Sequence, residues 1–211
     1  MNIFKKSIDK VKITPYSIYQ GHHNVKYRGI ETIKAPFDYV MYQMILFEVK
    51  PDLIIEIGSR KGGSALYLAD LLTLIGSGEI HTIDVTDNID SIVKAHPRIR
   101  IFTDGWENYD LGNAKVFENI LIIEDSLHTY ECTLGVLKKF KNLVTPGSYF
   151  IIEDGIIDEL GLEKKFYQGG PLRAIHEFLK TNTVYYIDRR WCDMFGKNAT
   201  FNVNGYLKRK N

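Results

Sequence analysis

The chain has 211 residues, and its 27 basic and 26 acidic side chains leave a formal net charge of +1. This balance provides no globally basic surface for nucleic acid, so we expect a small-molecule partner. No apolar run approaches the roughly 18 to 20 residues that span a bilayer, and the opening MNIFKKSIDK lacks a signal peptide's apolar stretch. Cys132 and Cys192 have no metal-type spacing, which disfavours a disulfide framework or a zinc site. We expect one globular, cytoplasmic protein, and the composition leaves homo-oligomerisation open.

Short apolar segments alternate with helix-like segments from residue 53 onward. The predicted strands cover residues 53–57, 79–84, 99–103, 120–124 and 148–153. Their continuous apolarity, rich in Ile, Val and Phe, is typical of parallel strands that are covered on both faces. The predicted helices cover residues 63–75, 89–95, 129–143 and 172–181. This alternation predicts an α/β fold, with a Rossmann-like sheet and helices on both faces.

Two further segments flank this alternating region. Pro36 stands where a helix would start, with apolar residues from Val40 to Val49 after it, so we expect residues 1–52 to form an N-terminal lid or packing segment. Near the C-terminus, VYYIDRR and ATFNVNGYLKRK are typical of two extended strands with no helix between them, which should pair antiparallel. Residues 53–211 are then the main domain, whose largely parallel sheet ends in an antiparallel edge strand.

The segment LIIEIGSRKGGSALYLADLL predicts a strand, a glycine turn and a helix in that order. Gly58 and Gly62 stand at the bend with Ser59 between them, and Ser64 stands near the helix start. Their spacing differs from the Gly-x-Gly-x-x-Gly of dinucleotide sites. Glu56, two residues before the first glycine, would repel a pyrophosphate and attract a cation. The turn therefore favours S-adenosylmethionine, which carries a sulfonium and an ammonium.

The segments after the next two strands supply further candidates for the cofactor site. Asp84 ends IHTIDV about 20 residues past the helix start, where an acid can accept hydrogen bonds from ribose hydroxyls. A strand-end Asp is also a common helix cap or turn residue. Asp104, Gly105 and Trp106, in TDGWENYD, could border the adenine, and Trp106 could equally belong to the core. Together with the glycine turn, these residues indicate an adenosyl-binding site.

Carboxylates follow two neighbouring strands of the predicted sheet. Asp125 lies in IIEDSLHTYE, and Glu153 and Asp154 lie in FIIEDG. Because adjacent parallel strands lie about 4.8 Å apart and end at the same crevice, these side chains should share one pocket beside the cofactor. Carboxylate oxygens are the ligands that Mg²⁺ prefers, although each acid could instead cap the following helix. The sequence therefore predicts a magnesium site made by these three acids.

His128 stands three residues after Asp125, and the two are the predicted catalytic residues. His128 could accept the proton of a substrate hydroxyl, whose pKa a divalent cation would lower, and a capping or surface role is equally open. His22 and His23 lie in a polar segment and could reach the site only through lid closure, so we expect no role in the reaction. Three arginines could clamp an anion but are better explained as solvated surface charge: Arg173, Arg189 and Arg190.

In this order, the motifs resemble the class I S-adenosylmethionine-dependent methyltransferases and, more narrowly, the rhamnosyl O-methyltransferase and cephalosporin hydroxylase family. The likeness runs from about Tyr27 to Lys208 and rests on YRGIETIKAPFDYVMYQ, PDLIIEIGSRKGGSAL, IHTIDV, EDSLHTYE, TPGSYFIIEDG, GGPLRAIHEFL and FGKNATFNVNGYLKR. The resemblance implies a seven-stranded sheet, bound S-adenosylmethionine, and Mg²⁺ held where the three acids stand. Family members often carry an acid at Leu127 and a tryptophan at Tyr27, and the first departure weakens the case for a fourth acidic ligand or base.

We therefore expect an O-methyltransferase, dependent on S-adenosylmethionine and Mg²⁺, that acts on a hydroxyl of a sugar, a glycosylated compound or a secondary metabolite. A hydroxylase is one alternative, although the sequence offers no convincing 2-His-1-carboxylate triad. A nicotinamide-dependent oxidoreductase would use the same sheet but prefer a pyrophosphate turn. A non-catalytic binding protein on the same scaffold is a third alternative. Neither the N-terminal segment nor residues 156–170 indicates which acceptor is used.

Overall fold

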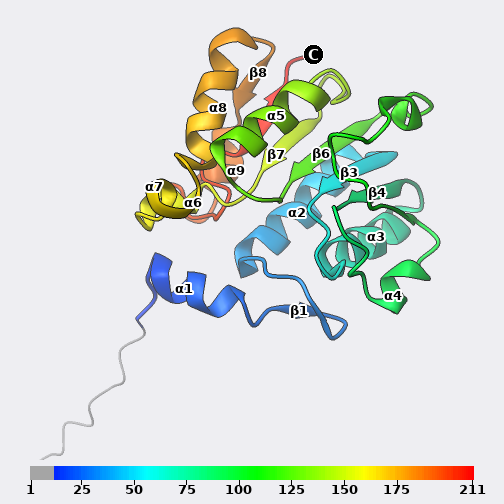
Figure 1. Ribbon diagram of the computed structural model, residues 1–211, viewed down its shortest axis with the longest axis horizontal. Helices are drawn as coiled ribbons and strands as arrows, with labels where there is room; N and C mark the ends of the chain where they lie inside the picture. The colour runs from blue at the N-terminus through cyan, green and yellow to red at the C-terminus, as the bar shows by residue number, and fades with distance from the viewer. Residues whose placement is uncertain (1–11) are drawn as a thin grey trace, which may run out of the picture.

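The computed structural model describes residues 12–211 (Figure 1). The first 11 residues of the predicted N-terminal segment, which include MNIFKKSIDK, lie outside the described residues. Within residues 12–211, no helix combines the length and the apolarity needed to cross a membrane.

A seven-stranded sheet with the strand order β5-β4-β3-β6-β7-β9-β8 forms the centre of the molecule. The strands are β3 (Leu53–Ile57), β4 (Glu79–Ile83), β5 (Ile99–Phe102), β6 (Ile120–Glu124), β7 (Tyr149–Ile152), β8 (Tyr185–Ile187) and β9 (Tyr206–Arg209). Strands β3 to β7 pair in parallel, whereas β9 pairs antiparallel with both β7 and β8. The predicted Rossmann-like, mostly parallel sheet is therefore confirmed. Its strand order reverses between β3 and β6, where ligands of such sheets bind.

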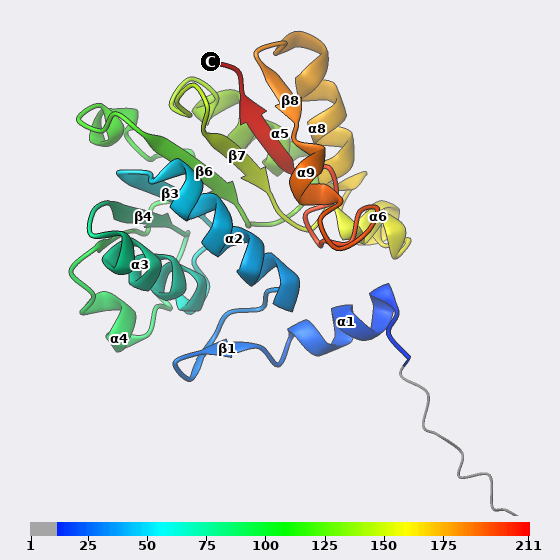
Figure 2. The same ribbon diagram turned by 180° about the vertical axis from the view of Figure 1, so that it is seen from behind.

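Helices cover both faces of the sheet. The long ones are α2 (Pro36–Val49), α3 (Gly63–Ile75), α5 (Tyr130–Phe140) and α8 (Gly170–Thr181). Helices α2 and α3 lie on one face, seen in front in Figure 2, and α5 and α8 lie on the other. Successive residues of β3 point to opposite faces, so Ile54 is buried with the first pair of helices and Ile55 with the second. This burial on both faces explains the continuous apolarity of the strands.

Shorter elements complete the structure. They are α1 (Pro15–His22), β1 (Lys26–Tyr27), β2 (Ile30–Glu31), α4 (Ser91–Lys94), η1 (Leu111–Ala114), α6 (Ile156–Glu159), α7 (Glu163–Phe166) and α9 (Arg189–Cys192). The segment before β3 thus contains α1, a short hairpin and α2, and α2 is packed into the core with Met41 and Ile45 fully buried. Its role as a lid stays a prediction.

The C-terminal region corrects the prediction of two extended strands with no helix between them. Helix α9 lies between β8 and β9, and the Asp188 side chain caps it by accepting a hydrogen bond from the Arg190 backbone N–H. The second predicted strand is also shorter, because β9 begins only at Tyr206. Asn198 and Asn204 before it have φ angles of 54° and 55°. This left-handed conformation, which Asn tolerates, turns the chain instead of extending it.

Candidate active site

A cavity of about 670 Å³ opens at the carboxyl ends of the central strands, where the strand order reverses. Its walls come from the glycine turn after β3 and from the segments that follow β4, β5, β6 and β7. Many of the predicted site residues line it: Gly58, Ser59, Ser64, Asp84, Gly105, Trp106, Asp125, His128 and Asp154. Four others do not contribute to the lining: Glu56, Gly62, Asp104 and Glu153. The structure therefore brings the predicted cofactor turn and most of the predicted acid cluster to one cavity.

Gly58 joins the glycine turn to the loop after β6. Its φ is 99°, and a Cβ placed on it would lie 1.9 Å from the backbone carbonyl oxygen of Asp125. Gly62 serves packing instead, because a Cβ there would lie 2.7 Å from a methyl carbon of Val93. Only glycine fits either position. The close approach at Gly58 fixes Asp125 beside the cofactor turn.

Asp84 holds the glycine turn from the end of β4. Its Oδ2 accepts hydrogen bonds from the backbone N–H groups of Ser59 and Arg60, each at 2.9 Å, and its Oδ1 accepts one from Val85 at 2.7 Å. Asp84 therefore orders the turn in this structure. Its predicted contact with ribose hydroxyls stays a prediction.

Glu56 is fully buried beneath the turn, and burial raises its pKa to about 7. Its Oε2 accepts a hydrogen bond of 2.6 Å from the Thr82 hydroxyl. Among the described residues, Glu56 Oε1 and the Ser64 hydroxyl are buried without a hydrogen-bond partner. Buried polar atoms are rarely left unpaired, so the Ser64 hydroxyl, which lines the cavity, leaves a hydrogen-bonding position for a polar ligand group.

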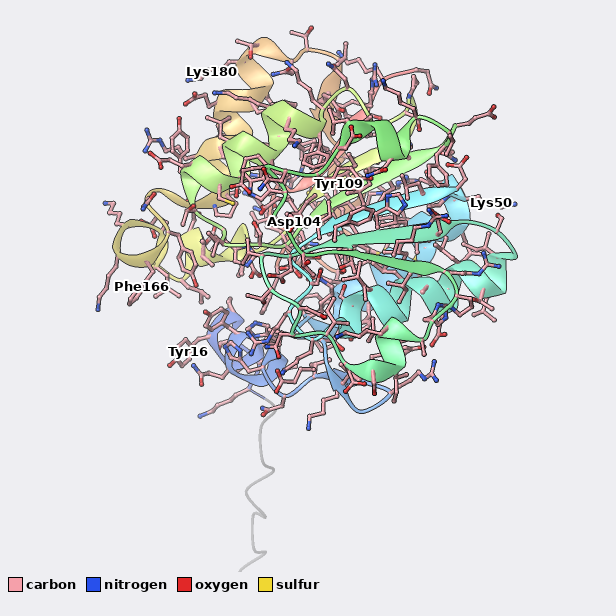
Figure 3. The ribbon with its side chains drawn as sticks, turned by 45° about the vertical axis from the view of Figure 1, so that its right-hand side comes forward. Tyr16, Lys50, Asp104, Tyr109, Phe166 and Lys180 are labelled. Atoms are coloured by element: carbon pink, nitrogen blue, oxygen red, sulfur yellow. The ribbon has the colours of Figure 1, made fainter. Side chains whose placement is uncertain are left out.

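Trp106 serves both the cavity and the core. It lines the cavity, and a Cβ on Gly135 of α5 would lie 2.7 Å from its ring carbon Cη2. The neighbouring Gly105 donates its N–H to the Asp84 carbonyl at 2.9 Å. Asp104 is exposed and accepts a hydrogen bond from the Asn108 side chain through its carbonyl oxygen, and Figure 3 labels it near the middle of the view.

Asp125, His128 and Asp154 converge on the cavity next to the glycine turn. Each can offer one ligand atom so that all three atoms lie within 4.8 Å of one another. His128 Nε2 lies 3.2 Å from Asp154 Oδ2 and 3.7 Å from Asp125 Oδ1. His128 and Asp154 have φ angles of 54° and 58°. Such left-handed residues are strained, and strain of this kind concentrates at functional sites.

The electrostatics of His128 follow from these neighbours. Burial alone would lower the pKa of its imidazole, but the carboxylates of Asp154 and Asp125 outweigh burial and raise it. Its Nδ1 is buried and has no hydrogen-bond partner within residues 12–211. The two carboxylates thus favour the protonated form of His128, and its Nδ1 is left unpaired.

Glu153 lies behind this group and is paired with residues that the sequence did not indicate as functional. Its Oε1 accepts hydrogen bonds of 2.5 Å from both Lys34 Nζ and the Tyr42 hydroxyl. Lys34 Nζ also donates to Asp125 Oδ2 at 2.9 Å. Burial would lower the pKa of Lys34, but these two carboxylates raise it well above its ordinary value. The role of Glu153 as a magnesium ligand stays a prediction, and one of its oxygens already accepts these two bonds.

The histidines and arginines outside this group have other surroundings. His22 is buried, with its ring centroid 5.1 Å from that of Phe201, and His23 is exposed. Arg190 is half exposed and pairs with Glu48 at 2.9 Å. The other two arginines considered as anion clamps also have protein partners. Arg189 pairs with Asp193, and the Arg173 guanidinium lies 3.8 Å from the centroid of the Tyr130 ring.

Comparison with known proteins gives the family. The family described as Rhamnosyl O-methyltransferase/CmcI matches residues 19–104 and 110–210. The rhamnosyl O-methyltransferase of Mycobacterium leprae is 30% identical over 190 residues, which cover 86% of this chain and 82% of that protein. A rhamnosyl O-methyltransferase of Mycobacterium tuberculosis is 29% identical over 189 residues, which cover 83% and 76%. The chain therefore belongs to the rhamnosyl O-methyltransferase/CmcI family, as its motifs predicted.

Solved structures show the same fold. A structure of CmcI described as Mg-SAM has a TM-score of 0.68 at 22% identity and covers 90% of this chain and 78% of its own. A CmcI structure described with SAH has a TM-score of 0.69 at 20% identity, with coverage of 96% and 95%. A Bacillus cereus O-methyltransferase in complex with SAH has a TM-score of 0.52 at 16% identity, covering 84% and 81%. With the family match, these likenesses confirm the predicted class, the S-adenosylmethionine-dependent O-methyltransferases.

Proposed function

We propose that this protein transfers a methyl group from S-adenosylmethionine to a hydroxyl of a sugar, a glycosylated compound or a secondary metabolite, with the help of Mg²⁺. The observation that carries the proposal is that one cavity joins the glycine turn to a group of three potential metal ligands. Relatives that are about 30% identical are named rhamnosyl O-methyltransferases, which supports a sugar hydroxyl as the acceptor.

The cofactor end of the cavity fits a cationic nucleoside. S-adenosylmethionine, when bound, supplies a methyl group activated by its sulfonium. The Ser64 hydroxyl lines the cavity without a partner and would pair with a polar group of such a ligand, and the buried Glu56 carboxyl would favour a cationic one. The backbone of Gly58 and Ser59 lines the cavity, and the exposed side of Trp106 offers an apolar surface for the adenine. Asp84 keeps the turn in place.

The acidic end of the cavity fits a divalent cation. Asp125 and Asp154 offer carboxylate oxygens within 4.8 Å of one another, and the His128 imidazole beside them would serve as the base and not as a ligand. Mg²⁺, when bound, supplies the charge that lowers the pKa of the acceptor hydroxyl. Glu153 does not line the cavity and its Oε1 is bonded to Lys34 and Tyr42, so it would reach the ion only through its other oxygen.

The protein's own residues then orient the acceptor and move its proton. Ile33, Leu127 and Gln168 also line the cavity and are candidates for contact with the acceptor. His128 would take the hydroxyl proton on Nε2, the nitrogen that faces Asp154 and Asp125. The two carboxylates would hold the resulting imidazolium by charge. The donor turn, the acceptor and the base would then share one cavity.

Transfer of an isotope-labelled methyl group to a panel of rhamnosides and other glycosides tests this function. The wild type should label a glycoside in the presence of Mg²⁺, and a chelator should abolish the labelling. His128→Ala should lower turnover by about 10²-fold or more while it still binds S-adenosylmethionine, because general-base catalysis contributes about that factor. His23→Ala, which changes an exposed histidine, is the matched control and should keep full turnover. Undiminished turnover of wild type in chelator would remove the metal from the mechanism.

A further inference from the structure

Lys34 is a buried cation that the proposed reaction does not use. Its side chain is 1% exposed, and its ammonium contacts Asp125 Oδ2 at 2.9 Å and Glu153 Oε1 at 2.5 Å. The ring of Tyr42 lies with its centroid 5.5 Å from Nζ, and the hydroxyl of the same Tyr42 donates to Glu153 Oε1. A buried ammonium is tolerated only when it is paired in this way.

The backbone around Lys34 is arranged to bring its side chain inside. Ile33 has a φ of 47°, a conformation that is a genuine outlier for a β-branched residue. Two residues earlier, Glu31 packs on α3 so tightly that a Cβ on Gly63 would lie 2.3 Å from the Glu31 carbonyl oxygen. Helix α2 then starts at Pro36. A strained residue between two fixed points implies a compensating interaction, and the ion pairs of Lys34 provide one.

The ammonium reaches the acids from the side away from the cavity. Asp125, His128 and Asp154 line the cavity, whereas Lys34 and Glu153 do not. Asp125 divides its oxygens between the two sides, because Oδ2 contacts Lys34 and Oδ1 faces His128. Three carboxylates this close would repel one another if none were neutralised. Lys34 offsets one of these negative charges through its contacts with Asp125 and Glu153, and it does not enter the cavity.

We propose that Lys34 is a positioning residue that serves as the built-in cation of the acid cluster, clamping Asp125 to Glu153 so that Asp125 presents Oδ1 to the cavity. The inference deepens the proposed function, and it rests on that function only for the metal ion on the cavity side. The ammonium offsets charge at Asp125 and Glu153, and a divalent ion in the cavity would offset more of the charge of the same cluster. Loss of Lys34 therefore leaves a fold that depends on the divalent ion.

Thermal denaturation of three variants, with chelator and with Mg²⁺, tests this role. In chelator, Lys34→Met should melt about 10 °C below wild type, because it leaves buried carboxylates without their counter-charge. Lys61→Met is the matched control, since Lys61 is a lysine whose ammonium bonds Asn88 at an exposed site, and it should melt like wild type. The double variant Lys34→Met, Glu153→Gln removes one charge of each sign and should regain much of the loss. Mg²⁺ should raise the melting temperature of Lys34→Met more than that of wild type.

Each result decides one of the two proposals. Lys34→Met melting like Lys61→Met in chelator, or a double variant no more stable than the single, overturns the role of Lys34. If Lys34→Met does not fold, a folded double variant supports the role and an unfolded one contradicts it. Absence of any Mg²⁺ effect in calorimetry of wild type and in melting of every variant removes the metal from the proposed function. In that case the melting temperatures measured in chelator still test whether Lys34 holds Asp125 to Glu153.

Discussion

The contact between Gly58 and Asp125 predicts that Gly58→Ala damages the fold and the site together. Gly58 and Gly76 have nearly equal φ angles, 99° and 96°, so an alanine at either position meets similar backbone strain. They differ in surroundings, because the new Cβ at Gly58 would lie 1.9 Å from the Asp125 carbonyl oxygen, whereas at Gly76 it would meet nothing within 4 Å. Gly76→Ala is therefore the matched control for the strain alone.

The magnitudes follow from this comparison. Gly76→Ala should lower the free energy of unfolding by about 1 to 2 kcal/mol, the cost of a left-handed L-residue. Gly58→Ala should cost about 1 to 3 kcal/mol more, because the overlap is with backbone and can be relieved only by moving β3 and β6 apart. Denaturant unfolding measures the difference, and calorimetry should show weaker S-adenosylmethionine binding only for Gly58→Ala. Equal unfolding free energies for the two variants would refute the argument.

Three further predictions concern the cavity. Asp154→Asn keeps a residue that tolerates the left-handed backbone, so it should melt like wild type in chelator yet lose most of the Mg²⁺-induced increase in melting temperature; an undiminished increase would exclude Asp154 as a ligand. Gly135→Ala should displace the Trp106 ring and weaken S-adenosylmethionine binding by about tenfold, or about 1.4 kcal/mol, and unchanged affinity would place the adenine elsewhere. Glu56 has a folded-state pKa of about 7 against an ordinary 4.5, so its contribution to stability falls as pH rises through that interval, by about 3 kcal/mol in total. Glu56→Gln should therefore lose less stability than wild type between those two pH values, and identical pH dependence would contradict the assignment.

The central strands could be predicted from the sequence because a strand buried on both faces is a short, nearly continuous run of apolar residues. Continuous runs such as residues 53–57 and 120–124 can be recognised without knowledge of their partners. The region after β8 has no comparable pattern of apolar residues. Its helix α9 has only four residues, and the turns before β9 depend on Asn198 and Asn204 adopting a conformation that the pattern of apolar residues does not encode.

The same distinction applies to the site. Residues at the ends of strands could be predicted, because strand order alone brings Asp125 and Asp154 to one edge of the sheet. The role of Lys34 could not be predicted, because its two partners are far away in the sequence. Asp125 follows it by 91 positions and Glu153 by 119. Its only trace is a lysine just before the apolar helix α2. Tyr42 was likewise indistinguishable from a core residue until its hydroxyl was seen on Glu153.

Calorimetric titration of the wild-type protein with S-adenosylmethionine tests the central claim most directly, because it requires no knowledge of the acceptor. We predict saturable binding to one site per chain, weakened in Gly135→Ala, and no comparable binding of a nicotinamide dinucleotide. Absence of S-adenosylmethionine binding, or tighter binding of the dinucleotide, would contradict the assignment of this cavity to a methyl donor.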